Sequence, residues 1–214
     1  MRKFRKRLGC SIGLFSAFIL WTIAVCCVDV QAIGPRGSSV GFAAINRLVH
    51  RLTGVHFNLY IITDWLGLIP IGVCMGFGIL GLVQWIQRKH ILKVDRSLLV
   101  LGGFYLAVMA AYAFFEVLTI NYRPVLIEGI LETSYPSSTT MLVMCVMPTA
   151  LMQIRTRSRN RMLSKCASIL ICAFIAFMVT GRLVSGVHWF SDIIGGALLS
   201  SALVMIYAAF IDIQ

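Results

Sequence analysis

Residues 181–192 read GRLVSGVHWFSD and lie between two long apolar runs. The stretch contains three ionisable side chains, Arg182, His188 and Asp192, next to segments that are apolar enough to enter hydrocarbon. A charge near hydrocarbon is costly, so an ionisable cluster at the end of a membrane span is a functional candidate. The alternative is that Arg182 only reaches the lipid headgroups and His188 only caps a helix. The surrounding sequence has to decide between these two interpretations.

The spacing within this stretch indicates a nucleophile. His188 and Asp192 are four residues apart, which places them on one helix face if a helix begins near Val187. A carboxylate bound to one imidazole nitrogen fixes the tautomer and leaves the other nitrogen free to attack or to accept a proton. The guanidinium of Arg182 offers a planar fork of donors to a phosphate or a carboxylate. We therefore expect His188 and Asp192 to act together beside an anion ligand.

The composition is that of a membrane protein. Hydrophobic residues make up 59% of the 214 residues and charged residues 13%, which excludes an ordinary soluble domain. Six apolar runs approach the roughly 20 residues that a helix needs to cross a bilayer, although the fourth is short and is expected to include residues on both sides. We predict an all-α, six-transmembrane helical bundle that forms one domain over residues 1–214. The runs are Leu8–Val28, Leu66–Ile86, Leu98–Ile120, Thr140–Ile154, Cys166–Val184 and Ile193–Ile211.

The basic residues alternate with the spans. Fourteen of the 19 lysines and arginines lie in residues 2–7, 88–96 and 155–165, which are alternate connections and therefore share one side of the membrane. The positive-inside rule then places both termini in the cytoplasm and the other connections outside. The net charge of +11 thus sets orientation, and we expect a plasma-membrane protein that binds no nucleic acid.

The N-terminal part of the sequence predicts two helices of different types. Residues 1–28 combine a basic start with an apolar run, and residues 30–32 pass for a signal-peptidase site. The run is long for a signal sequence, so we expect an uncleaved first span, and cleavage would leave the remaining topology unchanged. Farther on, apolar residues recur at helical spacing between polar ones, which predicts an amphipathic helix on the outer membrane interface. These apolar residues are Val40, Ala44, Leu48 and Leu52.

The cysteines do not indicate a metal site or a disulfide framework. All seven lie within or at the edges of apolar runs, and none has the spacing of metal ligands. They are typical of small residues in membrane helices. We expect neither a metal nor a cofactor.

Two more groups of polar residues fall on the predicted outer face. Residues 121–124, NYRP, follow the third apolar run, and residues 135–140, YPSSTT, precede the fourth. A proline and small hydroxyl residues before a span predict a helix N-terminus, whose free N–H groups bind anions. The span order brings Arg123, Ser137, Arg182 and His188 to one side of the membrane. Two arginines, a helix N-terminus and an oriented histidine describe a phosphate site with a nucleophile.

These stretches resemble the signature of the type 2 phosphatidic acid phosphatase superfamily, the six-span lipid phosphate phosphatases. That family has Lys, six residues and Arg-Pro, then Pro-Ser-Gly-His, then Ser-Arg, five residues, His, three residues and Asp. The third motif is matched at Arg182, His188 and Asp192, with Gly181 in place of Ser. The motifs occur in the family's order and on the same side of the membrane, and the resemblance covers about residues 60–212.

The resemblance implies a role for each matching residue. His188 would attack phosphorus and become a phosphohistidine while Asp192 holds its ring. Arg123, Arg182, Ser137 and the Ser138 backbone N–H would bind the phosphoryl oxygens. Glu128 and Glu132 are expected to be solvated loop acids.

Two departures from the family's motifs bear on the chemistry. Glu116 occupies the position of the first-motif lysine, and we expect it to pair with Arg123 if it points inward. Thr139 occupies the position of the second-motif histidine, which in the family protonates the leaving oxygen. General acid catalysis contributes ~10²–10⁴-fold, and a hydroxyl of ordinary pKa does not supply it. A phosphate leaving group, with a second pKa of about 6, needs that proton least.

We therefore expect the substrate to be a lipid pyrophosphate, such as the undecaprenyl pyrophosphate of bacterial envelopes, in preference to phosphatidate. Two alternatives of other classes stay open. One is a pseudoenzyme that binds lipid phosphate for sensing or transport, which the presence of His188 with Asp192 argues against. The other is a phosphotransferase that passes the phosphoryl group to a sugar or a lipid alcohol. The sequence indicates neither the chain length of the lipid nor the oligomeric state.

Overall fold

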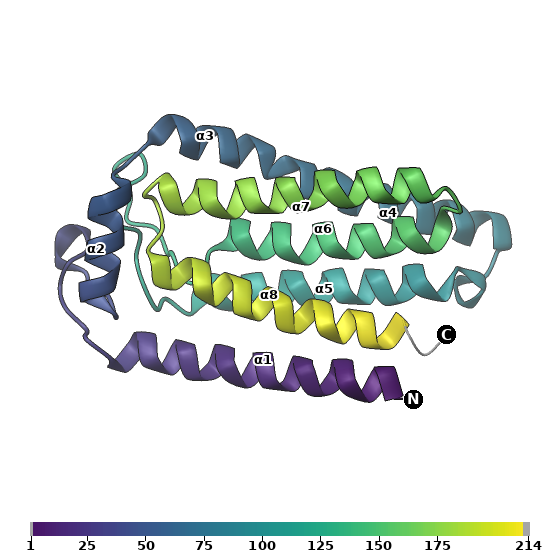
Figure 1. The fold of residues 1–214 in the computed structure, drawn as a ribbon, viewed down its shortest axis with the longest axis horizontal. Coiled ribbons are helices and arrows are strands. Elements are labelled where there is room, and N and C mark those ends of the chain that lie inside the picture. The colour runs from purple at the N-terminus through teal and green to yellow at the C-terminus, as the bar shows by residue number, and fades with distance from the viewer. Residues whose placement is uncertain (1, 212–214) are drawn as a thin grey trace.

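Helix α8 (Phe190–Ile211) lies among the other long helices of this computed structural model, which describes residues 2–211. It packs along α1 (Arg2–Cys27) and α6 (Ser138–Arg157) and also contacts α5 (Arg96–Val117). Helix α7 (Arg161–Val184) covers the other side of α6. These helices run roughly along one axis (Figure 1). The prediction of an all-α bundle is confirmed.

Five helical segments are long and apolar enough to cross a membrane: Arg2–Cys27, Phe57–Arg88, Arg96–Val117, Arg161–Val184 and Phe190–Ile211. The Phe57–Arg88 segment comprises α3 (Phe57–Leu66) and α4 (Leu68–Arg88), which meet at Gly67, so the helical run begins well before the expected second span. The protein is a multi-pass membrane protein.

Helix α6 has the length of a span but falls outside these five segments. Its surroundings explain its lower hydropathy, because it is packed among α4, α5, α7 and α8. Its buried polar groups are satisfied inside the bundle: the Gln153 amide donates to Tyr207 Oη over 2.7 Å, and Thr149 Oγ1 donates to the Cys145 carbonyl. As expected, the helix extends beyond Thr140–Ile154 at both ends. A helix enclosed by protein does not need a wholly apolar surface.

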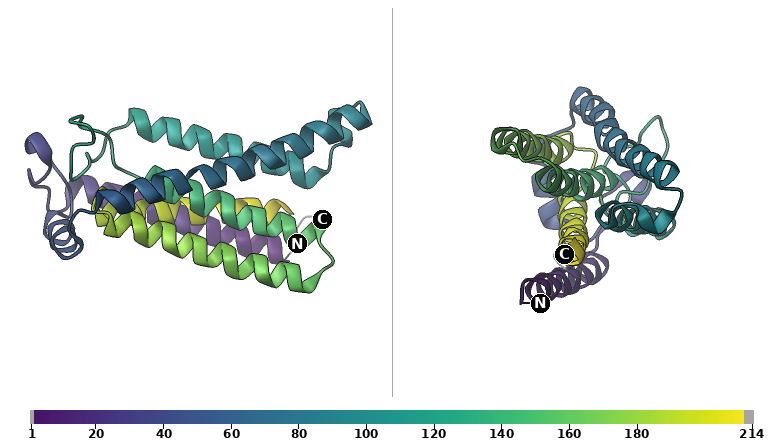
Figure 2. Two further views of the ribbon diagram at one scale, coloured as in Figure 1. Left: turned by 90° about the horizontal axis from the view of Figure 1, so that it is seen from above. Right: turned by 90° about the vertical axis from the view of Figure 1, so that its right-hand side faces the viewer.

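The connections divide between the two ends of the bundle (Figures 1 and 2). One end holds the beginning of α1, the end of α8, and the α4–α5 and α6–α7 connections, where fourteen of the 19 lysines and arginines lie. The other end holds α2 (Ala43–Thr53) and the α5–α6 and α7–α8 connections. The predicted separation of charge is therefore present in the fold.

Helix α2 lies across its end of the bundle (Figure 1). Asn46 is fully buried, and its amide donates to the Gly41 carbonyl over 2.8 Å and to Ser191 Oγ over 2.9 Å. Leu48 and Leu52 point outward and are 57% and 78% exposed. The amphipathic helix thus exists, with Asn46 turned toward the bundle and Leu48 and Leu52 exposed, although Val40 lies before it and is buried.

A close backbone approach joins the α2–α3 turn to the α7–α8 connection. The His56 N–H donates to the Ser185 carbonyl over 3.0 Å. Gly186 has a φ of +70°, and a Cβ there would lie 2.0 Å from the Gly54 carbonyl oxygen. Only glycine fits both the conformation and the space. This contact holds the segment that leads into His188.

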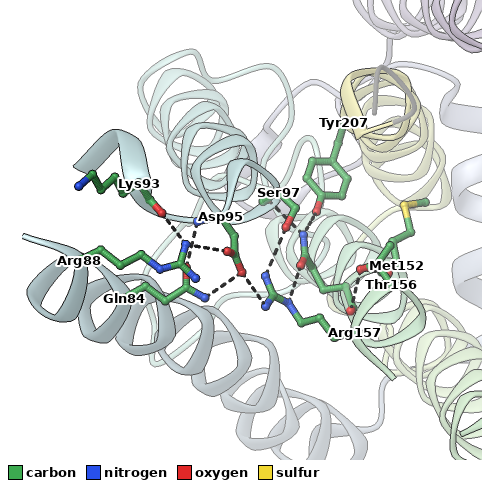
Figure 3. Close-up of polar contacts among 10 residues, drawn as sticks. Gln84, Arg88, Lys93, Asp95, Ser97, Met152, Thr156, Arg157 and Tyr207 are labelled. Carbon is green, nitrogen blue, oxygen red and sulfur yellow. Dashed lines mark hydrogen bonds and ion pairs between the residues drawn. The ribbon is translucent and has the colours of Figure 1, made fainter. Parts of the chain in front are cut away.

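A polar network ties the helices together at the basic end (Figure 3). Asp95, just before α5, accepts from Arg88 at 3.0 Å, from Arg157 at 3.1 Å and from Gln84 at 2.8 Å. The hydrogen bond from Gln84, with smaller effects of Arg88 and Arg157, holds the pKa of Asp95 below its ordinary value. The network links α4, α5 and α6, far from the residues predicted to form the site.

Candidate active site

The predicted site residues meet at the end of the bundle opposite the beginning of α1 and the end of α8. Arg182 lies in the last turn of α7, His188 in the short connection that follows, and Asp192 in the first turn of α8. All three are buried, with exposures of 2%, 3% and 0%. Burying an arginine, a histidine and an aspartate is costly unless each has hydrogen-bond or charge partners. The contacts of these three residues therefore indicate the function of the site.

Asp192 does not bind His188 directly. Among the described residues, Ser134 of the α5–α6 connection bridges the two side chains. Its Oγ is 3.0 Å from His188 Nδ1 and donates to Asp192 Oδ2 over 2.5 Å. The expected pair is therefore a chain of three residues. Helical spacing alone did not show this, because Ser134 comes from a segment more than fifty residues away.

Further contacts fix the carboxylate, among them a 3.4 Å hydrogen bond from Ser191 Oγ to Oδ1. Asn121 Nδ2 donates to Asp192 Oδ1 over 3.0 Å, and the Trp189 N–H donates to Oδ2 over 3.0 Å. The Trp189 indole donates in turn to the Tyr122 carbonyl over 2.8 Å. Each carboxylate oxygen thus has a protein donor, and Asp192 is rigidly oriented.

The two arginines lie beside the histidine. Their Cζ atoms are 4.9 Å (Arg182) and 5.9 Å (Arg123) from the centre of the Tyr60 ring. Arg123 forms an ion pair with Glu132 at 3.0 Å, and Arg182 contacts Asp64 at 3.3 Å. Burial, followed by the positive charges of Arg123 and Arg182, holds the pKa of His188 well below its ordinary 6.5. The imidazole is therefore neutral at physiological pH.

Several donor and acceptor atoms of the site residues have no hydrogen-bond partner within residues 2–211. They are His188 Nε2, Arg123 Nη1 and Arg182 Nε, and all are buried. His188 and Arg123 line a cavity of about 480 Å³, together with Ser134, Ser138 and Glu116. Buried polar atoms normally find partners, so atoms left over at a cavity indicate a ligand-binding role. Guanidinium donors around an imidazole acceptor suit a phosphoryl group.

Residues 115–213 match the family model of the PAP2 superfamily. In a comparison with solved structures, the chain is similar to the first transmembrane PAP2-type phosphatidylglycerolphosphate phosphatase from Bacillus subtilis. The TM-score is 0.58 at 19% identity, over 94% of this chain and 96% of the other, which shows a shared fold. A comparison with curated protein sequences finds no significant match.

The second PAP2 motif forms the start of α6. Ser137 Oγ accepts from the Thr140 N–H at 3.5 Å as an N-cap, and the Ser137 N–H donates to the Asp192 carbonyl over 3.1 Å. These groups are thus already engaged, whereas Ser138 lines the cavity. Thr139 Oγ1 accepts a 2.6 Å hydrogen bond from Arg182. Thr139 therefore positions an arginine where the PAP2 motif has histidine.

The expected pairing of Glu116 with Arg123 is wrong. Glu116 Oε1 accepts instead from Thr133 Oγ1 at 3.3 Å, and Arg123 pairs with Glu132, which was expected to be a solvated loop acid. Backbone pairing within the α5–α6 connection explains the difference. The Arg123 N–H donates to the Glu132 carbonyl over 3.0 Å, which brings the two side chains together. Glu128, by contrast, is exposed as expected.

Proposed function

We propose that this protein is a lipid phosphate phosphatase of the PAP2 type that acts through a phosphohistidine at His188. The observation that supports this most directly is the buried His188 Nε2, which has no partner among the described residues and belongs to a side chain on the cavity wall. A protein that only binds lipid phosphate needs the arginines but not an imidazole whose other nitrogen is held by a hydrogen-bonded chain. This argues against the pseudoenzyme alternative.

The proposed reaction has two displacements. His188 Nε2 attacks the terminal phosphorus and the P–N bond forms. The bond from that phosphorus to the leaving oxygen breaks, and this oxygen is the bridging oxygen of a lipid pyrophosphate, which departs with the lipid phosphate, or the lipid oxygen of a monophosphate. Water then attacks the phosphohistidine, the P–N bond breaks, and phosphate and the neutral histidine are released. Arg123, Arg182 and the Ser138 N–H at the start of α6 stabilise the negative charge of the phosphoryl oxygens in both steps. The arginines supply this charge, so we propose a metal-independent reaction.

We propose a polyprenyl pyrophosphate, such as undecaprenyl pyrophosphate, as the substrate. Thr139 accepts a hydrogen bond from Arg182 and offers no acidic proton to an alkoxide, whereas a departing phosphate scarcely needs one. Glu116 and Glu132 also line the cavity, and their carboxylates oppose a highly charged headgroup. The missing acid favours a pyrophosphate and the two carboxylates oppose one. The relative rates of hydrolysis of lipid mono- and pyrophosphates therefore decide this assignment.

We further propose that α6 crosses the membrane as the sixth span, that both termini are cytoplasmic, and that the site acts at the outer face of the plasma membrane. The basic end of the bundle, the burial of α6 among other helices and the outward-facing apolar side of α2 support this orientation. An outer site suits a carrier lipid whose pyrophosphate is released on that side.

Phosphate release by the purified protein in detergent tests the function. Wild type and Thr139→His are assayed on phosphatidate and on undecaprenyl pyrophosphate, with and without a chelator. We expect the wild type to favour the pyrophosphate, the chelator to have little effect, and Thr139→His to raise phosphatidate turnover selectively, by up to ~10²-fold. His188→Ala should abolish turnover. Full activity of His188→Ala would exclude the mechanism, and a wild type that is faster on phosphatidate would exclude the substrate assignment.

A further inference from the structure

Ser134 is the least expected member of the site, because none of the three motifs includes it. It precedes the Tyr135-Pro136 pair and is 3% exposed. Its Oγ contacts both His188 Nδ1, at 3.0 Å, and Asp192 Oδ2, at 2.5 Å. It also lines the 480 Å³ cavity.

The number of protons that His188, Ser134 and Asp192 share in their hydrogen bonds determines the tautomer of His188. A serine hydroxyl has one proton to donate. The Asp192 carboxylate can only accept, so it takes that proton, and its other hydrogen bonds come from Asn121, Ser191 and the Trp189 N–H. Ser134 Oγ must then accept from His188, so Nδ1 bears the hydrogen of the neutral ring. Nε2 is left with its lone pair directed away from the chain.

We propose that Ser134 is a positioning residue that sets the nucleophilic tautomer of His188 and couples its ring to Asp192. The hydroxyl does what a directly bound carboxylate does elsewhere: it accepts the Nδ1 hydrogen and holds the plane of the imidazole. When Nε2 becomes phosphorylated, the ring acquires a positive charge. Ser134 passes the stabilising effect of Asp192 to that charge through two hydrogen bonds, and no proton needs to leave Nδ1. This role rests on the proposed function for its catalytic consequence only.

The backbone of Ser134 is held independently of its hydroxyl. Its N–H donates to the Asn121 carbonyl over 2.9 Å, and the adjacent Tyr122 and Thr133 pair as an antiparallel bridge. Removal of the hydroxyl therefore leaves the connection anchored. A change in the ring's tautomer in Ser134→Ala is then a direct effect of the missing oxygen.

The first test reads the tautomer without any substrate. The chain has four histidines, so ¹⁵N-histidine labelling in detergent, with His188→Ala to identify the resonance, resolves the two ring nitrogens. We expect wild-type His188 to be protonated at Nδ1 at neutral pH. In Ser134→Ala the Nδ1 proton loses its side-chain acceptor, and the ring should shift toward the Nε2-protonated form. In Asp192→Asn the new amide can donate to Ser134, which then donates to Nδ1, so the shift should occur there too.

The second test measures turnover. Ser134→Ala should lower kcat by about 10- to 100-fold, as expected for loss of a hydrogen-bonding partner behind a functional histidine, while KM changes little. Ser134→Thr retains the hydroxyl and should recover most of the loss. Ser11→Ala is the matched control, because Ser11 is also a buried serine, bound to the Ala202 carbonyl at 2.9 Å in a different part of the bundle. It should retain wild-type kcat.

The outcomes separate this inference from the proposed function. A wild-type ring protonated at Nε2, or a tautomer unchanged in Ser134→Ala, overturns the positioning role whatever the activity. Equal losses of kcat in Ser134→Ala and Ser11→Ala also overturn it. If instead the tautomer shifts as expected but His188→Ala still hydrolyses lipid phosphates, the positioning role stands and the proposed phosphohistidine is wrong.

Discussion

The chemistry proposed for this protein depends on one nitrogen, His188 Nε2. That atom is useful as a nucleophile only while it is unprotonated, and the surroundings of the ring act in that direction. Burial and two nearby guanidinium groups oppose a positive charge on the imidazole. Ser134 opposes the wrong neutral tautomer by occupying the other side of the ring. Protonation state and tautomer are thus set by different neighbours.

The lowered pKa of His188 gives a pH prediction. An ordinary histidine, with a pKa of 6.5, is half protonated at that pH, whereas a ring whose pKa is depressed stays neutral as the pH falls further. We expect the acid limb of kcat/KM, which reports the free enzyme, to lie below pH 6.5. The substrate phosphate also titrates near this range, so two substrates with different phosphate pKa values are compared. A limb that stays at or above pH 6.5 for both would contradict the lowered pKa.

The residues of the site differ in how far the sequence could reveal them. Arg182, His188 and Asp192 have a fixed local spacing around a helix start, so the sequence predicted their proximity. Ser134 and Glu132 reach the site through irregular pairing of the α5–α6 connection, for which hydrophobic periodicity offers no signal. The same pairing explains why Glu116 was wrongly assigned to Arg123. Short-range patterns predict contacts within an element better than contacts between connections.

At the scale of elements, the connection between α7 and α8 has to hold His188 in place without secondary structure of its own. It does so by contacting the α2–α3 turn at Gly186, where the two backbones are too close for a side chain. The sequence showed the glycine but not the neighbour that requires it. By contrast, the helical start at Ser138 followed the predicted pattern of polar residues before an apolar run. Helix α8 begins at Phe190 and not near Val187, so His188 lies before the helix and does not share a helix face with Asp192.

Substitution of Gly186 tests this contact. Gly186→Ala combines an unfavourable φ of +70° with a Cβ 2.0 Å from the Gly54 carbonyl, so it should lower both thermal stability and turnover. Gly129→Ala is the matched control, because Gly129 has a φ of +78° but no atom within 4 Å of the added Cβ. Strain alone costs about 1–3 kcal/mol, so Gly129→Ala should lose only that amount. Equal losses of stability in detergent-purified variants would show that the close approach is unimportant.

Across the whole molecule, the two ends of the bundle have different tasks. One end gathers most of the basic residues and is held by the Asp95 network that links α4, α5 and α6 (Figure 3). The other end gathers the buried arginines, the histidine and the cavity. The sequence predicted this division, because hydropathy and charge are properties of long segments. They can be assigned without knowing which segments contact one another. The sequence did not predict that α6 would be the enclosed helix.

The orientation of the molecule can be tested by labelling two introduced cysteines. In a background free of the seven native cysteines, Ile130→Cys lies in the α5–α6 connection at the site end, where Ile130 is 61% exposed. Ser158→Cys lies in the α6–α7 connection at the basic end. The positive-inside rule predicts that an impermeant maleimide modifies Ile130→Cys in intact cells, and Ser158→Cys only after the membrane is permeabilised. The reverse pattern would place the cavity in the cytoplasm and remove the case for a lipid released outside. Labelling of both in intact cells would mean that α6 does not separate them, and the six-span topology would then be wrong.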